Sequence, residues 1–412
     1  MTRVEHSPPR PVGGEIWTKP FKVMAVLFAI AIGLLIWRFF VGLGPVTGLS
    51  DGYPWGLWIA FEVVVGTALA TGGYAVAILV YIMNNGKYHP LVRPALLTSA
   101  LGYTMGVIGV VIDLGRYWNV PWIPIRFWEW NLNSVLLEVA LCIALYVFVL
   151  WIEVSPFLLQ RWEKSGENER LARFSRWAIP RLKKAMPWII ALGLLLPTMH
   201  QSSLGSLMLL AGTKIHPLWY TPMLPLLFLL SCIAMGYAVV VLEGMTTRTA
   251  FGRLRETPVQ AGLTRAAVVV MALFVVARLA DIVIRGHVAD MIALTPMSAL
   301  FWTEMALFVV ALVLLLRRKE QYDRGHLFRA AGFMVLAGTL YRFSTFLIAF
   351  NPGEGWSYFP AIPELLITVG LTAGEIMAYI YIVKRFPIVG GVKPKGWPAT
   401  AAPQTQPAPA HS

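Results

Sequence analysis

The sequence has few charged residues and very few cysteines. Lys, Arg, Asp and Glu make up 13% of the 412 residues, about half of the ~25% that is usual in soluble domains. Two cysteines, Cys142 and Cys232, are too few for a disulfide scaffold, a cysteine-ligated iron–sulfur cluster or a zinc–cysteine site. Both lie in apolar runs, so we expect each to be a small buried hydrophobic side chain.

Nucleotide-binding and metalloprotease motifs are also missing. The sequence has no Walker, dinucleotide-binding or His-Glu-x-x-His pattern, and no catalytic residue for covalent chemistry can be assigned. What the sequence does have is apolar residues, at 57% with a mean hydropathy of +0.66, and a net charge of +13. Runs this apolar leave no room for a soluble fold with a basic face, which excludes nucleic acid and makes membrane lipid the expected surrounding.

Ten apolar segments are long enough to span a bilayer, since a spanning helix needs roughly 20 residues. The sequence therefore predicts an all-α polytopic membrane protein with ten transmembrane helices. The segments are Phe21–Val41, Leu57–Ile82, Leu91–Leu114, Leu132–Ile152, Trp188–Leu210, Trp219–Leu242, Leu263–Ile284, Met297–Leu316, Phe328–Phe350 and Ile362–Val383. Residues 1–18 and 386–412 are predicted to be mobile tails, and the charged loop 153–186 to carry a short surface helix.

The basic residues predict the topology. When Lys and Arg are assigned to alternate sides of the ten spans, 27 of the 34 lie on one side and four on the other. We call these the basic side and the opposite side. The positive-inside rule places the basic side, with both termini, in the cytoplasm. The remaining three, Arg38, Arg278 and Arg342, lie within spans.

An internal repeat divides the spans into two groups. Residues 73–79 resemble residues 236–242, and three shorter matches lie in the same order: Pro54 with Pro217, Asp113 with Asp281, and Glu138 with Glu304. Spans two to five (54–215) and six to nine (216–352) are thus predicted to be two parallel four-helix bundles. One extra helix lies at each end, within residues 19–53 and 353–385.

Ionisable residues inside spans are costly and are functional candidates by default. Glu62, Glu138 and His200 lie on three helices of the first bundle, toward the opposite side, and no Lys or Arg shares their depth. We expect one polar cavity to contain them together with Asp113, Arg116 and Gln201. Protonatable groups of this kind suit a proton relay or hydrogen bonds to a polar head group.

The second bundle carries charged residues that suggest a structural role. We expect ion pairs among Arg278, Asp281, Glu304 and Arg342, with Glu304 or Asp281 as the partner of Arg342, since an unpaired buried charge is very unfavourable.

Histidine is scarce within the spans. A bis-histidine haem needs two histidines at matching depth on facing helices, and only His200 lies well inside a span. The sequence therefore predicts no haem, and it predicts no metal site.

Several segments resemble the NrfD/polysulfide-reductase-C family of quinone-interacting membrane subunits, and within it the type found in uptake [NiFe]-hydrogenases. They are Tyr53–Trp58, Asp113–Arg116, Asn131–Glu138, Pro197–Leu207 and His216–Pro222, and the similarity covers about residues 17–385. The resemblance implies two four-helix bundles with an added helix at each end. It also implies no redox cofactor within the chain and a quinone, menaquinone or ubiquinone, bound near the periplasmic surface of the first bundle.

The resemblance also implies partners and a function. The partners are a periplasmic ferredoxin-like iron–sulfur subunit and the small and large [NiFe]-hydrogenase subunits, at the bacterial inner membrane. The expected function is hydrogen-dependent quinone reduction with coupled proton movement. The expected quinone site comprises Trp58, Asp113, Arg116, His200 and Gln201, and the expected proton path comprises Glu62, Tyr74, Glu138 and Glu375. The aromatic-rich segment 113–130 is a candidate docking surface.

Three alternatives remain open. The partner could be another oxidoreductase of this family, acting on polysulfide or nitrite or containing molybdopterin. Parallel repeats and membrane carboxylates also fit a secondary transporter, although transporters place their sites near the midplane. A third reading is a membrane anchor without quinone chemistry.

Overall fold

The computed structural model describes residues 9–165, 168–251, 257–316 and 324–390. Within these ranges the chain has ten helices long and apolar enough to cross a membrane, which confirms the predicted all-α polytopic fold. The described residues form no strand, only one isolated antiparallel bridge between Ile215 and Phe350.

The spans follow one another in chain order with short connections. The first is α1 (Lys19–Val41) and the second is assembled from η1 (Ile59–Gly66), α2 (Thr67–Leu69), α3 (Gly72–Ala77) and η2 (Ile78–Ile82). The remaining spans are α4 (His89–Asp113), α6 (Val135–Ser165), α7 (Glu169–Leu209), α8 (Leu224–Phe251), α9 (Thr257–Ile284), α11 (Pro296–Leu316), α12 with η8 (Arg324–Phe343, Ser344–Ile348) and α13 (Ile362–Arg385). Short helical turns lie in the connections: η3 (Gly86–Tyr88), η4 (Tyr117–Asn119), α5 (Trp122–Ile125), η5 (Phe127–Glu129), η6 (Gly212–Lys214) and α10 (Val288–Ile292).

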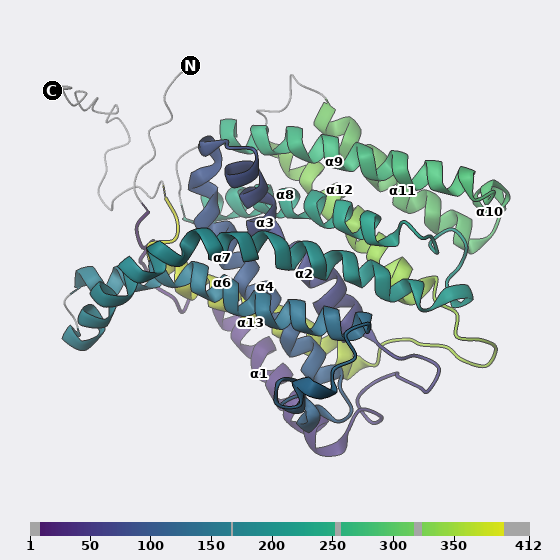
Figure 1. Ribbon diagram of the computed structural model, residues 1–412, viewed down its shortest axis with the longest axis horizontal. Coiled ribbons are helices and arrows are strands. Elements are labelled where there is room, and N and C mark those ends of the chain that lie inside the picture. The colour runs from purple at the N-terminus through teal and green to yellow at the C-terminus, as the bar shows by residue number, and fades with distance from the viewer. Residues whose placement is uncertain (1–8, 166–167, 252–256, 317–323, 391–412) are drawn as a thin grey trace.

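The helices pack as two bundles with one added pair (Figure 1). The second span, α4, α6 and α7 form the first bundle, and α8, α9, α11 and α12 form the second. The bundles meet where α7 and the second span pack against α8, and where α12 packs against η1. The two terminal helices, α1 and α13, lie side by side, and α13 also packs against α4. Both added helices therefore belong to the first-bundle side of the molecule.

Three glycines on one face of α4 allow the second span to approach closely. A Cβ atom at Gly102 would lie 2.6 Å from the Ala70 side chain, and one at Gly106 would lie 2.8 Å from that of Thr67. At Gly109 it would lie 2.6 Å from Glu62 Cβ. Small residues at such spacing are how helices pack tightly in lipid, where no hydrophobic force drives them together. The packing fixes Glu62 against α4.

The prediction of a loop with a short surface helix over 153–186 is wrong. Most of this region continues α6 to Ser165 and begins α7 at Glu169, which makes a long helical hairpin (Figure 1). The Asn168 side chain caps α7 by accepting from the backbone N–H groups of Arg170 and Leu171. Buried residues then recur at helical spacing, at Ala172, Ser175, Ala178 and Ile179, because the hairpin buries its own apolar face.

The prediction of mobile tails is also wrong for the described part of each terminus. The backbone N–H groups of Arg10 and Val12 donate to the carbonyls of Val389 and Val383, and Ile388 and Val389 are buried. The two chain ends thus hold one another. Residues 1–8 and 391–412 of the predicted tails lie outside the described residues.

Buried charges in the second bundle are paired, as expected, but with different partners. Arg278 pairs with Glu304 at 2.8 Å, and both side chains are almost fully buried. Asp281 pairs with Arg285 at 2.8 Å rather than with Arg278. Each carboxylate therefore has its own cation.

The expected carboxylate partner of Arg342 is a wrong prediction. Its guanidinium instead donates to the carbonyls of Val64 and Phe228, both at 2.8 Å, and to Ser231 Oγ at 3.2 Å. The π-helical geometry of η1 shifts backbone hydrogen bonds around Val64. A backbone carbonyl can thereby take the place of a carboxylate, and Arg342 joins the two bundles.

Removing one member of the Arg278–Glu304 pair should destabilise the protein more than removing both. Glu304→Leu leaves a buried arginine unpaired, at a cost of about 3–5 kcal/mol. The apparent melting temperature of the purified protein, followed by intrinsic fluorescence, should fall by roughly 5–10 °C and recover largely in Arg278→Met/Glu304→Leu. Glu129→Leu breaks the exposed Arg126–Glu129 pair and is the matched control, with little expected change. A double variant no more stable than Glu304→Leu would contradict this assignment.

Candidate functional site

Three side chains at the opposite-side end of the first bundle each have one buried polar atom without a protein partner. Trp58 is fully buried and Glu62 is 4% exposed, one turn later in the second span. Asp113 is the last residue of α4. Trp58 Nε1, Glu62 Oε1 and Asp113 Oδ1 make no hydrogen bond to any described residue. Buried polar groups are nearly always paired in native proteins, so this cluster is the first candidate for ligand or water binding.

In the second bundle, the two carboxylates that the repeat matches to Asp113 and Glu138 are bonded by protein groups. Asp281, which the repeat matches to Asp113, accepts from Thr221 Oγ1 at 2.7 Å in addition to its ion pair. Glu304, which matches Glu138, accepts from the Trp219 indole at 3.1 Å in addition to Arg278. At the matched pair Asp113 and Asp281, the first bundle thus leaves one carboxylate oxygen without a hydrogen bond, whereas the second bundle bonds both oxygens.

His200 and Gln201 of α7 lie further into the first bundle, and both are fully buried. Gln201 Nε2 donates to Thr67 Oγ1 at 2.9 Å and to Tyr103 Oη at 3.2 Å. The Tyr103 ring meets the imidazole of His200 edge-on at 5.7 Å. The His200 ring lies within reach of the Val139 backbone, but neither ring nitrogen makes a hydrogen bond of good geometry. The predicted site residue His200 is therefore a buried imidazole with at least one ring nitrogen open.

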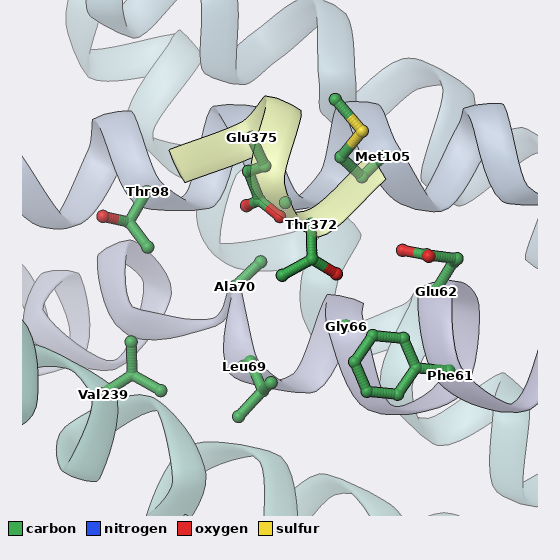
Figure 2. Close-up of a pocket in the computed structure, with 11 residues that line it drawn as sticks. Phe61, Glu62, Gly66, Leu69, Ala70, Thr98, Met105, Val239, Thr372 and Glu375 are labelled. Atoms are coloured by element: carbon green, nitrogen blue, oxygen red, sulfur yellow. The ribbon is translucent and has the colours of Figure 1, made fainter. Parts of the chain in front are cut away.

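A cavity of about 110 Å³ lies between the second span, α4 and α13. Figure 2 shows the carboxylates of Glu62 and Glu375 pointing toward one another across Thr372. Thr98 also lines the cavity, and its hydroxyl makes no hydrogen bond to a described residue. The cavity is large enough for several waters, so water can join the two carboxyl groups.

The cavity just described does not hold all six residues that were expected to share one cavity. Of these residues only Glu62 lines the cavity just described, and Glu375 of the added helix α13 replaces the others. Glu138 is half-buried at the start of α6, and Arg116 is exposed beyond the end of α4. The Tyr74 hydroxyl is hydrogen-bonded to Thr198 Oγ1 at 2.8 Å, away from the cavity. Helix α13, which lies outside the four-helix bundle, thus supplies the second carboxylate of this cavity.

Arg38 lies next to this cluster and was not among the predicted site residues. It is 1% exposed, and its guanidinium donates to the carbonyls of Ile112 and Leu114, each at 2.7 Å. Helix ends leave carbonyls without partners, and Arg38 satisfies two of them on either side of Asp113. The sequence feature that could have indicated this role is the position of Arg38 inside the first apolar segment.

Glu364 of α13 and Tyr358, in the connection before α13, hydrogen-bond the backbone that precedes the second span. Glu364 accepts from the Gly48 backbone N–H at 2.7 Å and from Tyr358 Oη at 2.8 Å, and Tyr358 Oη accepts from the Leu57 backbone N–H at 2.6 Å. Burial, and then the hydrogen bond to Glu364, raise the pKa of Tyr358 above its usual range. Tyr358 therefore remains a neutral donor, and the segment before Trp58 is fixed.

Comparison with known proteins identifies the family. Residues 45–351 match the family model described as polysulphide reductase, NrfD. The chain belongs to the NrfD family. It is 42% identical to the probable Ni/Fe-hydrogenase 2 b-type cytochrome subunit of Escherichia coli over 93% of this chain and 96% of that protein. It is 32% identical to the integral membrane subunit of a menaquinone reductase from Nitratidesulfovibrio vulgaris, over 40% of this chain and 37% of that protein. The family assignment and the ten spans make it a multi-pass membrane protein.

The prediction of no haem is contradicted by this comparison. The Escherichia coli relative is named a b-type cytochrome subunit, and a b-type cytochrome carries haem. The prediction of no haem had been based on the positions of the histidines, of which only His200 lies well inside a span.

The described residues do not offer a pair of axial ligands that fits such a haem. His200, a fully buried imidazole with at least one open ring nitrogen, suits one ligand position. The other described histidines, His89, His216, His287 and His326, lie at helix ends or in connections. The described part of the chain also holds no group of three or more metal-ligating side chains.

Arg38 should stabilise the backbone around Asp113. Arg38→Met leaves two buried carbonyls without donors, so backbone amides in residues 112–118 should exchange hydrogen about tenfold faster or more, as expected for the loss of ~1.5–3 kcal/mol from a charged hydrogen bond. Hydrogen–deuterium exchange read by mass spectrometry measures this. Lys22→Met on the exposed face of the same helix is the control. Unchanged exchange in Arg38→Met would show that Arg38 does not hold this segment.

Proposed function

We propose that this chain is the quinone-reducing membrane subunit of a respiratory [NiFe]-hydrogenase complex. The hydrogenase relative that covers nearly the whole chain and the menaquinone reductase relative support this assignment. The observation that carries it is a difference between matched carboxylates: Asp113 of the first bundle keeps one oxygen without a hydrogen bond, as Glu62 does, whereas both oxygens of Asp281 in the second bundle are bonded. The bacterial inner membrane, with the basic side in the cytoplasm, is the location that this function and the charge distribution favour.

The open groups of the first bundle suit the chemistry of a quinone. Quinone reduction takes up two electrons and two protons at the two carbonyl oxygens. The Trp58 indole and the His200 imidazole are hydrogen-bond donors for such oxygens, and Asp113 and Glu62 are proton carriers beside them. Hydrogen oxidation in the partner subunits releases two electrons and two protons, so the overall reaction balances.

Electrons would enter from an iron–sulfur partner docked on the opposite side, next to Asp113. The segment that follows α4 exposes large aromatic side chains, among them Trp118, Phe127 and Trp128, each about 60% exposed or more. Exposed aromatic residues are enriched at protein interfaces and at membrane surfaces. The segment leads directly from Asp113, so a partner docked there would lie beside the quinone site.

Protons would reach the quinone from the basic side along the interface between the first bundle and α13. The cavity joins Glu62 to Glu375. Tyr379 lies one turn beyond Glu375 on α13, and its hydroxyl donates to Glu243 of α8 at 2.5 Å. Glu62, Glu375, Tyr379 and Glu243 thus form a series of ionisable groups across the membrane, with water bridging the cavity. Tyr379 and Glu243 are additions to the sequence-based path.

His200→Ala should abolish quinone-linked hydrogen oxidation while the catalytic subunits continue to reduce an artificial dye. We expect a fall of about 100-fold or more, the usual range for loss of a positioned proton donor. The measurement is hydrogen-dependent quinone reduction by the intact complex in membranes, with dye reduction on the same sample. His89→Ala, an exposed histidine at the start of α4 on the basic side, should leave both activities unchanged.

Quinone reduction that survives His200→Ala would place the site elsewhere. Normal quinone reduction in Glu62→Gln/Glu138→Gln would show that these two carboxylates carry no protons to the quinone.

Glu375→Gln should interrupt proton delivery to the quinone from the basic side. A glutamine cannot carry a proton across the cavity, so proteoliposomes should lose most of the hydrogen-driven internal alkalinisation measured with a trapped pH dye. Glu375→Asp should retain it in large part. Glu163→Gln, at an exposed position of α6, is the control. Full alkalinisation in Glu375→Gln would exclude this path.

A further inference from the structure

A second cavity, of about 350 Å³, lies on the basic side and is lined almost entirely by cations and prolines. It is formed where α6 and α13 end, and the segment Pro9–Pro11 closes it. Arg10, Arg161, Lys164 and Arg385 line it, and no carboxylate does. Four cations around one cavity repel each other, and an anion in the cavity would remove that cost.

The walls of this cavity are held by backbone contacts. Besides the contacts of Arg10 and Val12 already described, the backbone N–H of Gly13 donates to the carbonyl of Lys384 at 3.1 Å. Arg161 Nη1 donates to the Arg385 carbonyl, and the Arg161 guanidinium lies over the Phe386 ring at 5.5 Å. The arrangement of the cations is therefore built into the fold.

Arg93 of α4 braces the same wall from behind. Its Nη1 donates to the Pro387 carbonyl at 3.0 Å and to Gln160 Oε1 at 3.2 Å. Three helices and both chain ends thus converge on one basic cavity.

The position of the cavity identifies its ligand. Arg385 is the last residue of the 24-residue candidate span of α13, and Arg161 of α6 donates to its carbonyl, so the cations lie near the depth of lipid head groups. The Trp162 and Phe386 rings meet edge-on at 5.9 Å beside them, and aromatic side chains are typical of this depth. Above the cavity the same helices expose apolar side chains, including Phe148 and Ile376, where acyl chains can lie.

We propose that this cavity binds the phosphodiester head group of an anionic phospholipid. Guanidinium and ammonium groups from two helix ends and the N-terminal segment surround the phosphate oxygens with charge-assisted donors. A bound lipid bridges α6, α13 and the N-terminal segment, and so stabilises the attachment of the added helices to the first bundle. The proposal concerns residues distant from the quinone site and does not depend on the proposed function.

Native mass spectrometry of the purified full-length chain tests the site. The probes are phosphatidylglycerol, cardiolipin and phosphatidylcholine, each added to delipidated protein. We expect the anionic lipids to bind about tenfold or more tightly than phosphatidylcholine, because each nearby cation contributes to the attraction of anionic head groups. In Arg10→Gln/Lys164→Gln/Arg385→Gln this preference should fall to about twofold or less.

The matched control removes the same charge elsewhere on the basic side. Arg176→Gln/Lys183→Gln/Lys184→Gln changes three exposed positions of α7 outside the cavity and should keep the preference. Arg10→Lys/Lys164→Arg/Arg385→Lys retains the charge and should also keep it, which separates loss of charge from loss of folding.

Three results would overturn the proposal. They are an unchanged lipid preference in the neutralised variant, an equal loss in the α7 control, and displacement of the lipid by inorganic phosphate at the same concentration. The last result would make the cavity a site for free phosphate.

Discussion

A charge inside the membrane must be paired, hydrogen-bonded or neutralised, and the arrangement of this protein depends on how that requirement is met. The second bundle meets it with protein groups, since Glu304 and Asp281 each have a cation and a further donor. Arg342 meets it with backbone carbonyls between the bundles. The first bundle leaves Glu62 and Asp113 incompletely bonded. The two bundles thus differ in how fully their buried carboxylates are hydrogen-bonded by protein groups.

The two added helices hold the open groups in place. Arg38 of α1 bonds the end of α4 on both sides of Asp113, and Glu364 of α13 orders the chain that leads into Trp58. Helix α13 also supplies Glu375 to the cavity beside Glu62. A four-helix bundle alone would lack these contacts. The added pair is therefore part of the site, although sequence similarity between the repeats does not extend to it.

The sequence was sufficient for the spans and the family, because long apolar runs and short motifs are local signals. It also singled out Glu62 and Asp113, since ionisable residues stand out in apolar surroundings. It could not show which residues share a cavity, because that depends on how α13 packs against α4. The carbonyl partners of Arg342 depend on local π-helical backbone, which has no clear side-chain pattern. The haem prediction failed because a count of histidines was treated as sufficient.

The most direct test of the account is an electron cryo-microscopy structure of the intact complex with bound quinone. The account predicts head-group density in the first bundle, within hydrogen-bond distance of an open group among Trp58, Asp113 and His200. The matched groups around Arg278 and Glu304 should show no such density. Quinone density beside Arg278 and Glu304, with the first-bundle groups bonded only to protein, would contradict it.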